Sequence, residues 1–177
     1  MRTVLLAVLL IGCGGDDGAT APTADAAVVV DAAIDAALPA FALTSPTITE
    51  GGTIPLTHVC TNRGGMNLSP ALTFTNVPAG TQSFVVTLTD LSNGLVHCAI
   101  YDIPGSATGL PADVDKMYAP PDVAGAHQPN AYTNMRGWAG PCPSVMHTYQ
   151  LKAYALATAT LPNATMNTTN EPGPARG

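Results

Sequence analysis

The sequence predicts an all-β protein, an antiparallel sandwich or barrel with long loops and little helix. Apolar runs of four to nine residues alternate with turn-forming Pro, Gly and Asn residues between positions 41 and 157. No part of this region carries a long helical period. With 177 residues and 46% hydrophobic side chains, the chain can form one domain with a substantial core.

Six apolar runs are the expected strands, and each ends at a turn residue or a proline-bearing segment. They are residues 41–44, 53–59, 72–75, 83–90, 97–103 and 148–156. Residues 110–139 contain several prolines and glycines, so we expect a long ordered loop between the last two strands.

The N-terminus is predicted to be a targeting segment. Residues 1–12 combine one basic residue with an apolar run that is too short to span a bilayer. Leu-Ile-Gly-Cys at positions 10–13 resembles the lipobox of bacterial lipoproteins, which implies acylation of Cys13. An acylated Cys13 would anchor the protein to a membrane of the bacterial cell envelope, on its periplasmic or surface side. An ordinary secretory signal is the alternative.

The segments on either side of the predicted domain have a different composition. Residues 13–40 repeat Asp-Ala-Ala three times and contain no aromatic residue, which is typical of a disordered tether. Residues 158–177 are polar and proline-bearing, which predicts a loose tail. The domain is therefore expected to span residues 41–157.

Charge and motif composition argue against several functions. The chain has 6 basic and 12 acidic residues, a net charge of -6, and its basic residues are scattered, so no nucleic-acid partner is expected. No Cys-x-x-Cys or comparable Cys/His spacing is present, so neither a metal site nor a cofactor is predicted.

Strand alternation brings polar residues to the ends of three predicted strands. Asp90 ends an apolar row in residues 83–90, and His97 and His147 begin two other rows, with Tyr149 on the face of His147. The same alternation turns Cys98 away from His97. A carboxylate at the end of an apolar row needs hydrogen-bonding partners. The pattern therefore predicts one small polar pocket.

Six segments, in order, carry a family resemblance. They are FALTSPTITEGGTIP, CTNRGGMNLSPALTF, VPAGTQSFVVTLTD, HCAIYDIP, GWAGPCP and HTYQLKAYAL. Together they resemble the phosphatidylethanolamine-binding protein (PEBP) family, in its bacterial Raf kinase inhibitor-like branch, over residues 41–156. The resemblance implies a Greek-key β-sandwich with a small anion-binding cavity at one end.

The resemblance also implies the ligand-binding residues and a disulfide. It assigns Asp90, His97, His147 and Tyr149 to the pocket, and residues 140–143, including Pro141, to its rim. Two histidines and a phenol beside a carboxylate suit a small anion such as phosphate, or a phospholipid headgroup. The family pattern is altered at Ser92, Cys98, Ser144 and Thr148.

Three cysteines remain after Cys13, an odd number for an oxidising compartment. The resemblance places Cys60 and Cys142 near the cavity, which favours that pair, with a bridge to Cys98 as the alternative. His58, a lone loop histidine, is expected at the surface.

These observations predict a membrane-tethered, non-catalytic binding protein. A hydrolase or lyase that uses Asp90, His97 and His147 as acid and base is one alternative. A regulator that binds a protein partner, such as a kinase or a protease, is another. The sequence contains no G-x-S-x-G motif, which disfavours one common hydrolase class.

Overall fold

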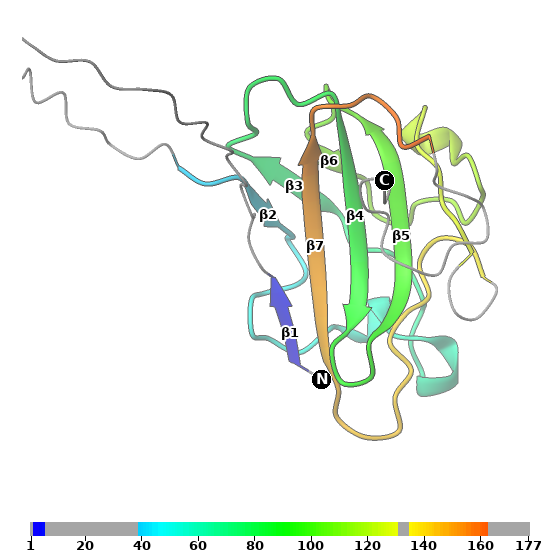
Figure 1. Cartoon of the computed structure of the whole chain (residues 1–177). Coiled ribbons are helices and arrows are strands. Elements are labelled where there is room, and N and C mark those ends of the chain that lie inside the picture. Colours follow the sequence, from blue (N-terminus) through cyan, green and yellow to red (C-terminus); the bar gives the residue numbers. More distant parts are fainter. Residues whose placement is uncertain (1, 6–38, 131–134, 163–177) are drawn as a thin grey trace, which may run out of the picture. The chain divides into compact units, whose positions relative to one another are not determined.

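The structure is a computed structural model that describes residues 2–5, 39–130 and 135–162. Its strands form two sheets, with the orders β1-β7-β4-β5 and β2-β3-β6 (Figure 1). All pairs are antiparallel except β1 with β7. The strands are β1 (Arg2–Leu5), β2 (Ala42–Thr44), β3 (Leu72–Thr75), β4 (Ser83–Asp90), β5 (Leu95–Pro104), β6 (Gly109–Leu110) and β7 (Thr148–Leu156). The predicted all-β class is confirmed.

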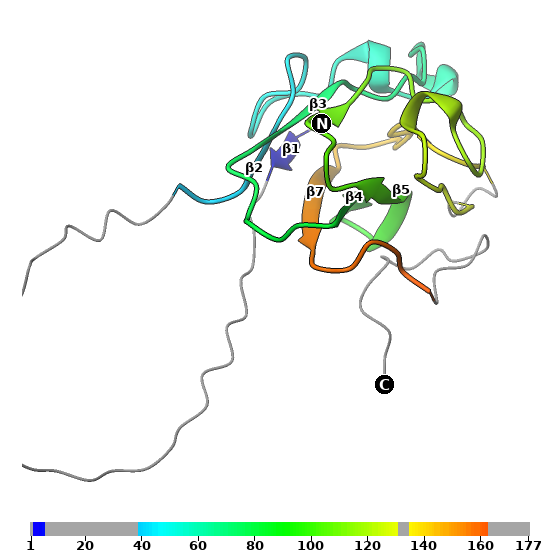
Figure 2. The ribbon, with the colours of Figure 1, turned by 90° about the horizontal axis from the view of Figure 1, so that it is seen from above.

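The core lies between the two sheets. Seen from above in Figure 2, β7, β4 and β5 form one layer, and β2 and β3 lie on one side of it. Phe74 of β3 stacks on Phe84 of β4 with ring centroids 4.5 Å apart, and Phe41 packs on Phe84 at 5.9 Å. These rings are buried, and such pairs add directional packing to the hydrophobic burial that holds the sheets together.

Residues 53–59, predicted to be a strand, form no strand. Residues 56–58 and 61–63 are the short 3-10 helices η1 (Leu56–His58) and η2 (Thr61–Arg63), and a third, η3, spans Pro121–Val123. Pro55 has no N–H to donate to a sheet. Local hydrogen bonds instead fold this segment back on itself, with the N–H groups of Met66 and Asn67 donating to the carbonyls of Leu56 and Val59.

An irregularity in β5 changes which side chains face the core. Leu88 pairs with Cys98, whereas Thr89 pairs with Val96, so His97 is an extra residue in a β-bulge. Directly opposed side chains project to the same face, so Cys98 joins Leu88 in the core, on the face that carries Asp90. The prediction that Cys98 points away from the face of His97 was therefore wrong, because a bulge interrupts the alternation.

The predicted flanking segments lie largely outside the described residues, including Cys13, residues 6–38 and residues 163–177. β1 falls within the predicted signal peptide, and its pairing with β7 does not test cleavage. At the other end, Ser83 Oγ donates to the carbonyl of Thr158, and Leu161 N–H donates to Asp102 Oδ1. The first residues of the predicted tail are thus hydrogen-bonded to the sandwich.

Candidate functional site

Three strand ends meet where the pocket was predicted. Asp90, the last residue of β4, pairs with Tyr149 of β7 on one side and Leu95 of β5 on the other. His97 sits in the bulge near the start of β5, and His147 immediately precedes β7. The pocket that they form has a volume of about 260 Å³. It is lined by Asp90, Asn93, Leu95, His97, Cys142, Pro143, Ser144, His147 and Tyr149.

Asp90 accepts hydrogen bonds from several groups around the pocket. Its side chain is 2% exposed, and its Oδ2 accepts from His147 Nδ1 at 2.6 Å. Its Oδ1 accepts from the backbone N–H of Ser92 at 2.9 Å, and the Tyr149 hydroxyl also donates to the carboxylate. Burial raises the pKa of Asp90, but these hydrogen bonds outweigh that effect and lower the pKa below its ordinary value. Asp90 is therefore a carboxylate at neutral pH.

His97 is held as a neutral imidazole. Its Nδ1 donates to the carbonyl of Ala139 at 2.9 Å, and its Nε2 lies 3.9 Å from Asp90 Oδ2. The ring is buried and meets the Tyr149 ring edge-on at 5.2 Å. Burial lowers the pKa of His97, and the Ala139 and Asp90 contacts only partly offset this. The two histidines therefore differ in burial and in their contact with Asp90. The side chain of His147 is 22% exposed, and its Nδ1 donates a hydrogen bond directly to the carboxylate.

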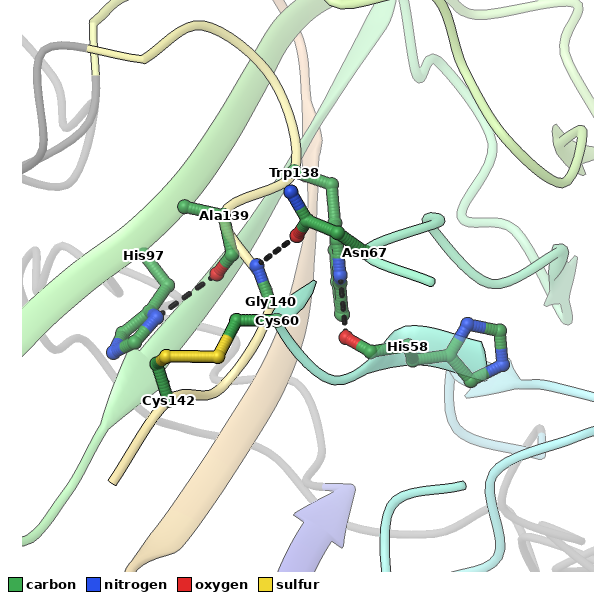
Figure 3. Close-up of a disulfide and its surroundings, with 8 residues drawn as sticks. All are labelled: His58, Cys60, Asn67, His97, Trp138, Ala139, Gly140 and Cys142. Carbon is green, nitrogen blue, oxygen red and sulfur yellow. Dashed lines mark hydrogen bonds between the residues drawn. A yellow bond between two sulfur atoms is a disulfide. The ribbon is translucent and has the colours of Figure 1, made fainter. Parts of the chain in front are cut away.

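Figure 3 shows a disulfide at the rim of the pocket and three hydrogen bonds around it, from His97 to Ala139, from Gly140 to Asn67 and from Trp138 to His58. The structure joins Cys60 to Cys142, the pair that the family resemblance favours, and leaves Cys98 as a buried free thiol. Beside the bridge, Cys60 N–H donates to the carbonyl of Pro141 at 3.1 Å, and Gly140 N–H donates to Asn67 Oδ1 at 2.7 Å. The segment before β7 is thereby fastened to residues 58–67.

Close approach explains the glycine in this rim. A Cβ on Gly140 would lie 2.4 Å from the carbonyl oxygen of His58 and 2.8 Å from Asn67 Oδ1. No real side chain tolerates such contacts, so only glycine lets the two segments pack this closely.

His58 is buried, so its predicted surface position was wrong. Its Nδ1 donates to the carbonyl of Leu68 at 2.8 Å, and its Nε2 accepts from Thr47 Oγ1 at 2.8 Å. Its own carbonyl accepts from Trp138 Nε1 at 2.9 Å. His58 therefore connects the segment that carries Cys60 to the segment that leads into the pocket.

The structure brings four of the predicted ligand residues together, namely Asp90, His97, His147 and Tyr149. The fifth predicted residue, Pro141, is buried and does not line the pocket. It immediately precedes Cys142, which does line it. Their roles in binding a ligand stay a prediction.

Sequence reasoning missed several contributors to the site. Asn93 and Leu95 line the pocket, and Asn67 and Trp138 brace its rim. Asn93 and Leu95 could have been predicted, because they follow Asp90 closely in the chain and a tight turn after a strand brings the next residues back beside its end. No local signal marks Asn67, because its partner lies 73 residues away.

The donor set suits a small polar ligand. Imidazole and phenol groups line the pocket beside a carboxylate, and its lining contains no Lys or Arg. Within the described residues, no group of three His, Cys, Asp or Glu side chains could hold a metal ion. Ser144 also lines the pocket.

The chain thus has the architecture of a β-sandwich protein with a polar pocket at one end of its strands. The sequence profile described as phosphatidylethanolamine-binding protein matches residues 44–174. The chain belongs to the phosphatidylethanolamine-binding protein family. The match extends past residue 157, the expected domain boundary.

Relatives and solved structures agree with this assignment. The chain is 36% identical over 132 residues to the UPF0098 protein YbcL of Escherichia coli, covering 70% of this chain and 72% of the relative. It is 32% identical over 118 residues to a UPF0098 protein of Aquifex aeolicus, covering 63% and 66%. The crystal structure of E. coli YbcL, described as a new member of the mammalian PEBP family, matches with a TM-score of 0.65 and 34% identity, covering 72% of this chain and 83% of that one. A putative PEBP homologue from Chlamydia trachomatis gives a TM-score of 0.57 with 26% identity, covering 70% and 79%.

Proposed function

We propose that this protein is a non-catalytic binding protein of the Raf kinase inhibitor-like branch, whose pocket takes a small anion or a phosphorylated headgroup. The observation that carries the proposal is the convergence of His97, His147 and Tyr149 on Asp90 in one pocket. Imidazole and phenol groups can donate hydrogen bonds to phosphate oxygens, and Asp90 orients the His147 ring by accepting a hydrogen bond from its Nδ1.

Isothermal titration calorimetry with phosphoethanolamine and inorganic phosphate tests the pocket. The wild type should bind, and His97→Gln and His147→Gln should each weaken binding. His127→Gln is the matched control, because His127 does not line the pocket. Equal binding by all four proteins would rule out this pocket as the binding site.

An enzymatic function is less well supported. Asp90 and His147 form a hydrogen-bonded acid-base pair, but Cys142 in the pocket lining is held in a disulfide and is not a free nucleophile. Turnover of a phosphomonoester or carboxylic-ester panel that disappears in His147→Gln would establish the enzymatic alternative instead.

The proposal includes a lipid anchor at Cys13 and a place in the bacterial cell envelope. Its support is the sequence Leu-Ile-Gly-Cys after a short apolar run. Among the described residues, no helix has the length and apolar character needed to cross a bilayer. Labelled palmitate should be incorporated into the wild type and not into Cys13→Ser. Equal labelling of both would place the acyl group elsewhere.

A further inference from the structure

The turn between β4 and β5 carries the one Asn-Gly pair of the sequence, Asn93 and Gly94. Both residues are exposed, and the turn lies at the end of the sheet that holds the pocket (Figure 1). Asn93 also lines the pocket together with Asp90 and Leu95. The Asn-Gly pair is therefore open to solvent and adjacent to the groups that are proposed to bind a ligand.

Hydrogen bonds fold the side chain of Asn93 back along its own backbone. Its Oδ1 accepts from the backbone N–H of Leu95 at 3.0 Å, which is the contact of an Asx turn. Gly94 has a φ of 77°, a conformation that glycine adopts without steric cost. The side-chain amide of Asn93 is thereby kept beside the peptide group that joins Asn93 to Gly94.

This arrangement favours an intramolecular reaction of the amide. The backbone nitrogen of Gly94 loses its proton to water and bonds to Cγ of Asn93, the Cγ–Nδ2 bond breaks, and ammonia leaves a five-membered succinimide ring. Water then adds to one of the two ring carbonyls, and the ring opens to aspartate or isoaspartate. Both products carry a carboxylate where the amide was.

Two features of the turn assist the attack, and one contact opposes it. The hydrogen bond from Leu95 N–H polarises the carbonyl that is attacked, and it stabilises the negative charge that develops on Oδ1. Gly94 has no Cβ to obstruct the approach of its nitrogen. Against this, Gly94 N–H donates to the carbonyl of Asp90 at 2.8 Å, and the turn must open to release it. Exposed turns open at far lower cost than the fold as a whole.

Other asparagines of the described part of the chain serve as internal comparisons. Each of them precedes a residue that has a side chain, and that side chain hinders the attacking nitrogen. They are Asn62, Asn67, Asn76 and Asn130, followed by Arg, Leu, Val and Ala.

We propose that Asn93 deamidates spontaneously in the folded protein, and that the carboxylate so formed weakens the binding of anions by the pocket. The second part rests on the proposed function. The pocket lining holds one carboxylate, Asp90, and it has no Lys or Arg that could neutralise a second one. A new negative charge in this lining repels an anionic ligand, and salt screens the repulsion.

Peptide mass spectrometry on the full chain tests the modification. After incubation of the native protein at mildly alkaline pH, the peptide with Asn93 should gain the mass difference between a hydroxyl and an amino group. The peptides with Asn67 and Asn76 should not gain it. No gain at Asn93, or an equal gain at Asn67 and Asn76, would overturn the proposal.

Two variants test the part played by Gly94 and by the length of the side chain. Gly94→Ala should slow the gain, because its Cβ hinders the attack; that Cβ meets no atom within 4 Å beyond its chain neighbours, so there is room for it. Asn93→Gln should show no gain in the same time, because the longer side chain must close a larger ring. Gain at the wild-type rate in both variants would overturn the proposed route.

Isothermal titration calorimetry with inorganic phosphate tests the consequence. Asn93→Asp should bind phosphate about tenfold more weakly than the wild type at low ionic strength, and added salt should narrow the difference. Asn93→Gln is the matched control, and it should bind like the wild type. Incubated wild type, separated from the unmodified protein by its extra charge, should behave like Asn93→Asp. Equal affinity of Asn93→Asp and the wild type would overturn the effect on binding.

The two measurements separate this inference from the proposed function. If the wild type binds phosphate but Asn93 gains no mass, the modification fails and the proposed function stands. If Asn93 gains mass but the wild type does not bind phosphate, the modification stands, and the proposed function fails together with the effect on binding.

Discussion

Asp90 and His147, 57 residues apart in the chain, share a hydrogen bond of 2.6 Å from His147 Nδ1 to Asp90 Oδ2. The pair joins the end of β4 to the residue that precedes β7. Because Asp90 also accepts from Ser92, one buried carboxylate holds together the β4–β5 turn and the segment before β7. Substitutions at this carboxylate should therefore affect both stability and the pocket.

Asp90→Asn should lower the free energy of unfolding at neutral pH by about 1–3 kcal/mol, since an amide has one acceptor oxygen and cannot satisfy all the buried donors. The folded-state pKa of Asp90 is lowered, so its contribution is present above the ordinary value of 3.8 and is lost as pH falls through the folded pKa. Urea unfolding at several pH values measures this. The wild-type and variant curves should converge in acid, whereas exposed Asp115→Asn should match the wild type throughout.

His97→Gln should make stability less dependent on pH. The pKa of His97 is lowered in the folded state, so as pH falls below the ordinary value of 6.5 the unfolded chain takes up the proton first. Wild-type stability should therefore decline between about pH 8 and about pH 5.5, and His97→Gln should decline less. Guanidinium unfolding at the two pH values checks this. An equal or steeper decline in the variant would contradict the assignment of a buried neutral ring.

Removing the disulfide with Cys60→Ala and Cys142→Ala should destabilise the fold by about 2–4 kcal/mol, because the bridge closes a long loop in the unfolded chain. The two cysteines are 82 residues apart. The rim should loosen as well, with weaker binding of phosphoethanolamine. Urea unfolding and calorimetry measure the two effects. Adding a reductant should lower the stability and the phosphoethanolamine affinity of the wild type to the same extent. It should change neither quantity in the double variant.

Cys98 should be chemically inert in the folded protein. Burial raises the pKa of its thiol to about 12, so almost no thiolate is present at neutral pH. In a Cys13→Ser background, a colourimetric thiol reagent should titrate no thiol in the native protein and one after unfolding without reductant. Rapid reaction of the native protein, lost in Cys98→Ala, would show that the site is accessible.

Much of the sheet could be predicted because strand alternation is a local property. The runs 83–90 and 148–156 coincide with β4 and β7, and Asp90 closes its apolar row as expected. The segment 53–59 could not be assigned correctly, because its hydrogen bonds run to residues 66–68 in place of a sheet partner. His58 was misplaced for a similar reason, since Thr47 and Leu68 satisfy its ring from two other segments.

By itself, the sequence determined the strand-forming runs, the family resemblance and the polar residues at the strand ends. Each of these depends on residue type and short spacing. Only the tertiary structure decided that His97 occupies a bulge and that Cys98 faces the core. It also decided that Cys60 meets Cys142 beside the pocket. The physical reason is that register, disulfide pairing and burial depend on which distant segments pack together, and no local pattern encodes those contacts.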